Sequence, residues 1–327
     1  MITNEDIWKI ALQQSAYDSG CQPEDFLKEE NVVTISKVHP LARKYLKLPL
    51  SCDLVSYGSN IVAQASEEIA PLVRQYIDRY PVEHCFETPN LHVLDQLLQP
   101  FGQKICFMAE YYLPDVALVK ELPCDYELRV LYQEDFKSLY LPQWSNALCE
   151  ERKHLDVLGV GAYDDGKLVG LAGCSADCEE MYQIGVDVLP EYRRKGIASA
   201  LTSRLALEVL ARGKVPFYCA AWCNIKSVRN AIRCGFRPAW VAMTAKDVSF
   251  VDEMNRGEKE KNDGKLGDTF DDRRRSSDAA SGAGQAGILC WQYCSRLQCG
   301  ECGLDCVYPV QGSDALDARG AKESIGL

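Results

Sequence analysis

The sequence predicts an α/β protein, with a mixed central sheet flanked by helices, a smaller N-terminal α/β domain and a disordered C-terminal tail. Segments with the two-residue period of strands alternate with segments of helical period over about the first 250 residues. One strand, which ends at Val188, continues through a basic loop directly into a helix. Beyond residue 255 the chain becomes charged and then rich in serine, alanine and glycine, a composition that cannot bury a core.

The same patterns divide the chain into four parts, and its 327 residues suit about two domains. The first part is predicted to be a companion α/β domain and the second a linker. The main domain follows, and the last part is a low-complexity, cysteine-containing tail that we expect to be disordered. The boundaries are 1–112, 113–124, 125–252 and 253–327.

The companion domain is predicted to begin with a helix, because Thr3 and Asp6 form a capping pattern before Ile7, Ile10 and Ala11, which share a face. Its order of strand, helix, helix, glycine and strand loosely repeats the later half of the main domain. We interpret it as a degenerate copy without a phosphate-binding loop. The other elements expected here are a strand at 32–35, a hairpin around 58–59, helices at 68–80 and 91–98, and a strand at 104–111.

In the main domain, Asp164-Asp165-Gly166 is a strong tight-turn signal between two strands. The helix after the basic loop is expected to end at Arg212-Gly213, and the continuously apolar run 215–221 is typical of a strand buried on both faces. The remaining elements expected are strands at 126–131, 157–163, 167–174 and 182–188, a helix starting at 133–136 and a helix over 144–154.

The basic loop at residues 190–196 has the features of a phosphate site. A helix start exposes backbone N–H groups without intrahelical partners and carries the positive end of the helix dipole. Gly196 has no Cβ and permits a close approach, and the small Ala198 keeps the next turn open. This strand–loop–helix resembles the R-x-x-G-x-G/A signature of the GNAT superfamily of N-acetyltransferases, which binds the pyrophosphate of acetyl-coenzyme A (acetyl-CoA).

A second motif lies downstream. Asn224-Ile225-Lys226-Ser227 opens a helical stretch that closes at Cys234-Gly235-Phe236, and this resembles the family's N-x-x-S/A…G-F segment. Asn224 can cap the helix, and Gly235 can adopt the left-handed conformation that ends it. The two motifs together cover roughly residues 125 to 250.

The resemblance implies a site for acetyl-CoA as cosubstrate. Backbone groups of Val186 and Val188 would pair with the pantetheine arm like an extra strand. Asn224 would contact the arm further along, or would act only as a helix cap. The residues expected around the pyrophosphate, mostly through main-chain N–H groups, are Arg193, Arg194, Lys195, Gly196, Ile197, Ala198 and Ser199.

The reaction implied is direct attack of a primary amine on the thioester in a ternary complex, which needs a base, an oxyanion donor and an acid. Many family members carry a tyrosine acid seven residues after the asparagine, where this chain has Ala231. Cys223 or Tyr218 could lie near the sulfur, although packing explains both. Glu180, rather than Glu179, is the tentative base, with a solvated turn carboxylate or an ordered water as the alternatives.

The acceptor is expected to be an amine on a small molecule or a peptide, and Trp144, Ser145 and Asn146 are candidates for lining its pocket. The rival interpretation is a catalytically inactive CoA-binding sensor or scaffold, motivated by Ala231 and by the absence of an obvious base. The net charge of −11 argues against nucleic acid and anionic membrane as partners. Scattered single cysteines and the lack of a readable signal peptide or membrane span indicate a cytoplasmic protein.

The tail contains five cysteines, and a C-x-x-C unit of this kind can bind zinc. Their spacing is irregular, so we expect no metal, and a zinc-dependent partner-binding module stays the alternative. The cysteines are Cys290, Cys294, Cys299, Cys302 and Cys306.

Overall fold

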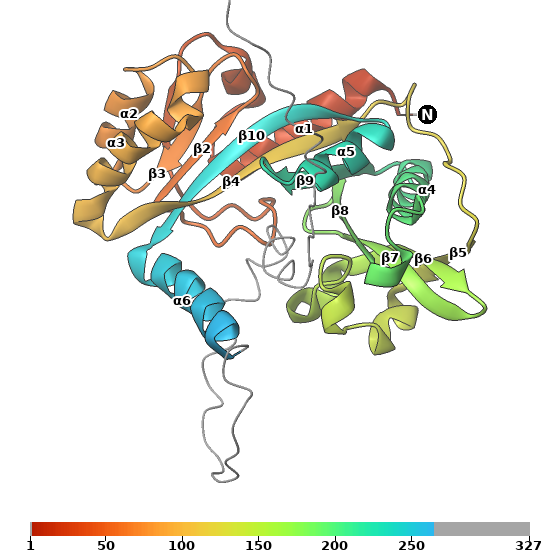
Figure 1. Ribbon diagram of the computed structural model, residues 1–327. Coiled ribbons are helices and arrows are strands. Elements are labelled where there is room, and N and C mark those ends of the chain that lie inside the picture. The colour runs from red at the N-terminus through yellow and green to blue at the C-terminus, as the bar shows by residue number, and fades with distance from the viewer. Residues whose placement is uncertain (1, 265–327) are drawn as a thin grey trace, which may run out of the picture.

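The structure, a computed structural model, describes residues 2–264 (Figure 1). Its helices are α1 (Asn4–Ser19), α2 (Ala70–Ile77), α3 (Thr88–Leu98), α4 (Ile197–Ala211), α5 (Ile225–Arg233) and α6 (Val248–Gly264). Its strands are β1 (Val32–Ile35), β2 (Cys52–Ser56), β3 (Val62–Ala65), β4 (Gln103–Pro114), β5 (Glu127–Tyr132), β6 (Asp156–Asp164), β7 (Lys167–Ser175), β8 (Met181–Val188), β9 (Val215–Ala221) and β10 (Phe236–Asp247). All ten form one mixed sheet in the order β1-β3-β2-β10-β4-β9-β8-β7-β6-β5. The predicted α/β fold with a mixed, helix-flanked sheet is therefore confirmed.

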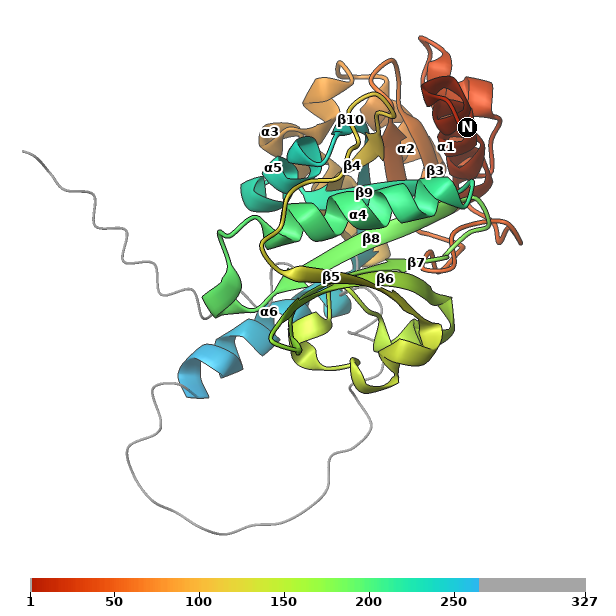
Figure 2. The ribbon, with the colours of Figure 1, turned by 90° about the vertical axis from the view of Figure 1, so that its right-hand side faces the viewer.

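Side chains alternate between the two faces of this sheet. Tyr112 of β4 packs in a core with α4 and α5, whereas its neighbour Tyr111 packs in a core with α1. Helix α4 lies along β8 (Figure 2), and its Leu201, Leu205 and Val209 are fully buried against the sheet. The basic loop at residues 190–196 therefore leads into a helix that packs closely against the sheet.

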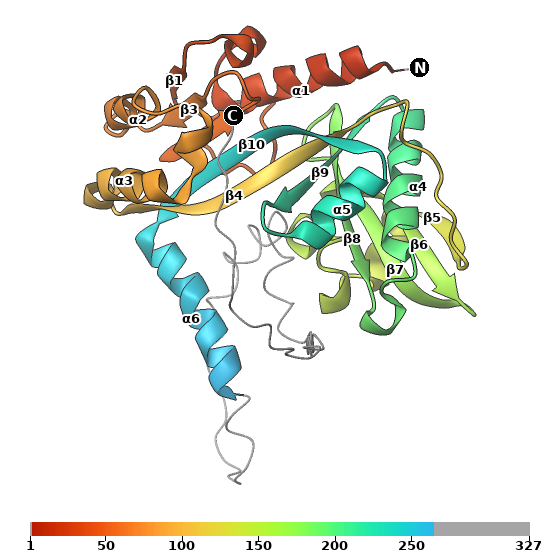
Figure 3. The same ribbon diagram turned by 45° about the horizontal axis from the view of Figure 1, so that its top comes forward.

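The two long central strands join the first part of the chain to the last. Strand β4 lies between β9 and β10 and pairs with β10 from Gln103↔Asp247 to Pro114↔Phe236. On its other side β10 pairs with β2, through Val55↔Ala242 among others. Figure 3 shows β4 and β10 crossing together from the side of α3 to the side of α5. Each half of the chain thus inserts one strand into the sheet of the other.

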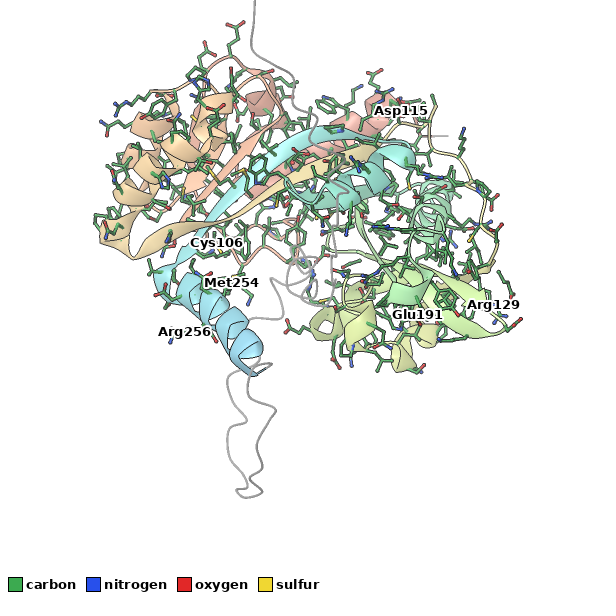
Figure 4. All side chains as sticks on the ribbon, in the orientation of Figure 1. Cys106, Asp115, Arg129, Glu191, Met254 and Arg256 are labelled. Carbon is green, nitrogen blue, oxygen red and sulfur yellow. The ribbon has the colours of Figure 1, made fainter. Side chains whose placement is uncertain are left out.

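Polar and sulfur contacts hold the two ends of this strand pair. Asp115, just after β4, accepts hydrogen bonds from Asn4 Nδ2 at 2.9 Å and from Arg237 Nε at 2.7 Å, which ties the start of α1 to the start of β10. At the other end, Met254 of α6 reaches Cys106 of β4 with a sulfur–sulfur distance of 3.9 Å (Figure 4). These contacts fix α1 and α6 on the face opposite α4.

Several local predictions are confirmed. The N–H of Asp6 donates to Thr3 Oγ1 at 3.1 Å and the N–H of Thr3 donates to Asp6 Oδ2 at 2.9 Å, a reciprocal capping box. Strands β2 and β3 form the expected hairpin. Asp165 and Gly166 have φ of 46° and 83°, because the two-residue turn between β6 and β7 needs positive φ at both positions.

The predicted helix over 144–154 is wrong. The structure has two short 3₁₀ turns there, Pro142–Trp144 and Glu150–Leu155. Between them, the N–H groups of Asn146 and Cys149 donate to carboxylates of the sheet, Asp187 and Asp156, at 2.8 Å each. In an α-helix these two N–H groups would donate to the carbonyl groups four residues earlier. Here they donate to the two carboxylates instead. The helix expected from 133–136 is likewise only a 3₁₀ segment, Gln133–Ser138.

The chain also differs from expectation at the start of the predicted tail, since α6 continues to Gly264. The predicted disorder of the remaining tail and its cysteine cluster, Cys290 to Cys306, lie outside the described residues. Within residues 2–264, no helix is both long and apolar enough to cross a membrane. The same part of the chain holds no cluster of three or more metal-ligating side chains.

Candidate functional site

The centre of the candidate site is an opening between β8 and β9. The two strands pair in parallel only from Met181↔Val215 to Ile184↔Tyr218. Strand β8 then continues to Val188 with its other edge on β7, while β9 pairs with β4. Backbone groups of β8 that face β9 therefore have no strand partner beyond Ile184, and an extended chain can bind there by adding strand-like hydrogen bonds. Val186 and Val188 both lie in this open stretch.

The basic loop lies at the end of this opening. Arg194 and Gly196 have φ of 65° and 83°, and Gly196 is the N-cap of α4. A non-glycine residue in the left-handed region is uncommon and marks a constrained backbone. Nothing lies within 4 Å of the position that a Cβ on Gly196 would take, so the positive φ and the need for open space explain the glycine better than crowding does.

The backbone amides at the start of α4 are available to a ligand. Ile197, Ala198 and Ser199 form the first turn, where an α-helix has no internal acceptor for N–H groups. In the described part of the chain no other group accepts from these amides. Arg193, Arg194 and Lys195 are exposed, so protein does not cover the loop. Free amides, the helix dipole and three cations are together features that can attract an anion.

Two of the loop's cations are held by neighbouring groups. Lys195 Nζ lies 4.9 Å from the centre of the Tyr192 ring and donates to the Tyr126 hydroxyl at 3.1 Å. Arg193 Nε donates to the carbonyl oxygen of Val188 at 3.1 Å. Arg193 and Lys195 therefore stay beside the end of β8, where they add positive potential to the loop.

The second motif forms a capped helix beside the opening. Asn224 Oδ1 accepts the N–H of Ser227 at 3.2 Å, so Asn224 does cap α5. Gly235 ends the helix with a φ of 87°, and a Cβ there would lie 2.6 Å from the Val119 nitrogen. Ala231 is fully buried.

Tyr218 lies at the last residue pair before β8 and β9 separate, and its side chain faces α5. Its hydroxyl is 2.9 Å from Ser227 Oγ. Burial raises the pKa of Tyr218 to about 12, so the phenol keeps its proton at neutral pH. A protonated hydroxyl at this point can act as a hydrogen-bond donor.

Glu180 is not brought to the loop. It precedes the first residue of β8, and eight strand residues at about 3.3 Å each separate it from the loop by about 26 Å. Its carboxylate is 3.1 Å from Lys214 Nζ. Glu180 and Tyr182 line a pocket of about 720 Å³ between α1, residues 40–44 and the start of β8. The loop residues, Val186, Val188 and Asn224 surround the opening, and Glu180 lies at the opposite end of the strand.

Sequence reasoning missed Asp187, which lies between Val186 and Val188 on the face away from α4. Its carboxylate accepts hydrogen bonds from the N–H of Asn146 at 2.8 Å, from Asn146 Nδ2 at 2.6 Å and from the N–H of Ala147 at 3.0 Å. Burial raises the pKa of Asp187 to about 6, although these bonds oppose the shift. The available signal was that Asp187 is the single charged residue of its strand.

Two glycines explain how the segment Asn146–Ala147 comes close enough to bond to Asp187. Gly173 and Gly185 are register partners on β7 and β8. A Cβ on Gly185 would lie 1.7 Å from the Asn146 carbonyl oxygen, and one on Gly173 would lie 2.1 Å from that of Ala147. The segment Asn146–Ala147 therefore rests directly on the sheet in a furrow that only glycine permits. Trp144 is buried in the core below the segment, whereas Ser145 and Asn146 are half-buried.

Comparison with known proteins identifies a family for this chain. The profile of the GNAT acetyltransferase family matches residues 75–239, which is half of the chain. A comparison with curated proteins gives no match. A GCN5-related N-acetyltransferase-like protein from Streptococcus suis is 21% identical over 47% of this chain and 67% of its own, with a TM-score of 0.36.

Two further solved structures are similar over part of the chain. A GNAT-family acetyltransferase from Colwellia psychrerythraea is 16% identical over 48% of this chain and 62% of its own, with a TM-score of 0.35. YncA from Salmonella typhimurium, solved with its cofactor acetyl-CoA, is 17% identical over 37% of this chain and 93% of its own, with a TM-score of 0.29. This chain thus spans less than two thirds of the Colwellia protein.

A strand opening that leads to a helix N-terminus with free amides can accept an extended ligand with an anionic end. The family match is more specific: the chain belongs to the GNAT acetyltransferase family. The cosubstrate of this family, acetyl-CoA, fits both features, because it joins a diphosphate to an extended, amide-containing arm.

Proposed function

We propose that the protein is an N-acetyltransferase that moves an acetyl group from acetyl-CoA to a primary amine by direct attack in a ternary complex. The observation that carries the proposal is the continuity between the open edge of β8 and the free amides at the start of α4. An arm bound along β8 would bring its thioester towards the last paired residues, Ile184 and Tyr218.

The residues have separate roles in this proposal. The amides of Gly196, Ile197, Ala198 and Ser199 bind the diphosphate, supported by Arg193, Arg194 and Lys195. Backbone groups of Val186 and Val188 pair with the arm, and Asn224 lies further along it. The amine nitrogen attacks the thioester carbon, the C–S bond breaks, and the amide and the free thiol of CoA leave as products. Holding both reactants in one opening supplies much of the acceleration.

The amine proton has two possible acceptors, which depend on the direction from which the amine approaches. Glu180 is our proposed base for an acceptor that approaches from the 720 Å³ pocket, and its ion pair with Lys214 must then open. An ordered water is the alternative for an amine that approaches across Asn146. Tyr218 would donate a hydrogen bond near the sulfur in either case.

The test is acetyl transfer by the purified full-length chain. The protein is incubated with acetyl-CoA and spermidine, L-lysine, tyramine or a peptide with a free N-terminus, and thiol release is followed together with the mass of the product. We expect the acetylated amine and free CoA in equal amounts. Thiol release that is the same with and without every amine would contradict the proposal.

The rival, a CoA-binding sensor without catalysis, has one observation in its favour. The position where many family members carry the tyrosine acid is Ala231, which is fully buried and has no ionisable group. Isothermal titration with CoA and acetyl-CoA distinguishes the two functions. Tight binding of both ligands without turnover on any amine would favour the sensor.

A further inference from the structure

The segment Asn146–Ala147 crosses the sheet where β8 and β9 separate. Gly185, on which it rests, is the first residue of β8 beyond the last pair with β9. The segment lies on the face opposite α4, which holds the pyrophosphate loop. An amine that approaches the opening from this face meets Asn146 directly beside the place where β8 and β9 separate.

Asp187 fixes the orientation of the Asn146 side chain. An ionised carboxylate can only accept hydrogen bonds, so the group at 2.6 Å from Asp187 Oδ1 must be the amide nitrogen Nδ2. Asn146 Oδ1 then lies on the other side of the amide. Among residues 2–256, whose side chains the structure describes, no group donates to this oxygen. The result is a half-buried, oriented hydrogen-bond acceptor beside the opening.

The backbone below Asn146 is equally constrained. Asp187 also accepts the N–H groups of Asn146 and Ala147, and Gly173 and Gly185 allow the segment to lie against the sheet. The backbone of Asn146 and its side-chain amide are therefore both held by Asp187 before a ligand binds. A residue that is already ordered loses little conformational freedom on binding, which favours affinity.

We propose that Asn146 Oδ1 binds the acceptor by taking a hydrogen bond from its amine N–H, and that Asp187 with the Gly173–Gly185 pair positions Asn146 for this role. The inference rests on the proposed acetyl transfer. It assigns recognition of the primary amine to Asn146, and it makes Asp187 a positioning residue that does not touch the substrate.

The test compares three variants with the wild-type chain: Asn146→Ala removes the acceptor, Asp187→Asn removes the charge that fixes it, and Gly185→Ala lifts the segment. The matched control is Asp53→Asn. Asp53 is another buried carboxylate of raised pKa; it lies on β2, four strands away from β8, and bonds to Thr244 on β10. Kinetics use the amine of the panel that the wild-type protein acetylates fastest. CoA affinity and amide hydrogen exchange at residues 146–147 are measured in parallel.

Loss of one hydrogen bond to a ligand should raise KM for the amine about tenfold in Asn146→Ala, with kcat less affected. Asp187→Asn and Gly185→Ala should show the same rise together with faster exchange at residues 146–147. CoA affinity should stay within about twofold of wild type in all variants, and Asp53→Asn should leave KM for the amine unchanged.

The outcomes separate this inference from the proposed function. Faster exchange in Asp187→Asn without any change in KM would overturn the role of Asn146 while acetyl transfer stands. An equal rise in KM in Asp53→Asn would also overturn it, because the effect would then reflect general loss of stability. Absence of transfer by the wild-type protein would remove the proposed function, and the inference with it.

Discussion

Arg43 and Asp18 form an ion pair that is buried inside the protein. The guanidinium of Arg43 donates to the carboxylate of Asp18 in α1, and both side chains are nearly inaccessible to solvent. The same guanidinium lies 5.1 Å from the centre of the Phe217 ring of β9 and 5.5 Å from that of Trp240 of β10. One side chain of the first part of the chain therefore contacts α1 and two strands of the second part.

This pair leads to a prediction about stability. Arg43→Ala should lower the free energy of unfolding by about 3–5 kcal/mol, because it leaves the Asp18 carboxyl group buried without its partner. The double variant Arg43→Met, Asp18→Asn should lose much less. Urea unfolding of the single and double variants measures both values. If the double variant lost at least the sum of the single losses, the ion pair would not explain the effect.

The exchanged strands predict that the second part of the chain cannot fold alone. A fragment of residues 125–252 lacks β2 and β4, so β9 would lose one strand neighbour and β10 would lose both of its neighbours. We expect this fragment to be insoluble or unfolded, whereas residues 2–264 give cooperative unfolding. Circular dichroism and size-exclusion chromatography test it. A soluble, folded fragment that binds CoA would show that β4 is dispensable.

Much of the fold could be predicted from local patterns. The cap at Thr3, the turn at Asp165-Gly166 and the apolar run of β9 each depend on neighbouring residues, and each was found. The helix expected over 144–154 failed because its N–H groups bond to Asp156 and Asp187, which come later in the sequence. Local propensity cannot register such distant partners.

The candidate site likewise combines features set by neighbouring residues with features set by residues distant in the sequence. The basic loop is a continuous motif, so the residues of the proposed pyrophosphate site could be named from the sequence. The role of Asp187 depends on a segment forty residues away and on the register of Gly173 with Gly185. Nothing in the neighbourhood of either glycine in the sequence indicates that a backbone segment crosses it. Glu180 lies just before β8, as expected, but its position relative to the opening depends on where β8 and β9 separate, which the sequence does not show.

The loop predicts a sharp loss of CoA binding on substitution of Gly196. Gly196→Glu should weaken affinity about 100-fold or more, because it adds negative charge and a Cβ at a φ of 83° beside the bound diphosphate. Gly166→Ala is a control at the same φ, likewise without neighbours within 4 Å, but in the β6–β7 turn. Titration calorimetry should show normal CoA affinity in that control. Normal affinity in Gly196→Glu would contradict the assignment of the loop.

The position of Tyr218 predicts that its hydroxyl affects kcat but not the affinity for CoA. Tyr218→Phe removes the hydroxyl beside the separation of β8 and β9, and kcat should fall about tenfold while CoA affinity stays constant. Tyr76→Phe is the control, since the hydroxyl of Tyr76 also bonds inside the protein, to the Cys85 carbonyl at 2.8 Å, but far from the opening. An unchanged kcat in Tyr218→Phe would remove the tyrosine from the mechanism.

Three buried carboxylates predict an unusual dependence of stability on pH. Burial raises the pKa of Asp53 to about 6, of Asp156 to about 7 and of Asp187 to about 6. In the unfolded chain all three return to the ordinary range near 4, so between about pH 4 and pH 7 the folded protein binds more protons than the unfolded one. The contribution of these groups to the free energy of unfolding is therefore largest at the acid end and falls as pH rises.

Each pKa unit corresponds to about 1.4 kcal/mol, so the three groups together should lower stability by several kcal/mol across that window. Urea unfolding at about pH 5 and about pH 7.5 measures the change, and the triple Asp→Asn variant should show a smaller one. In a protein of net charge −11, general charge repulsion also changes with pH. Because this change occurs in the variant as well, the comparison of variant and wild type isolates the three carboxylates. Equal pH dependence in the variant and the wild type would mean that these carboxylates titrate normally in the folded protein, and that the bonds holding Asn146 do not depend on a desolvated Asp187.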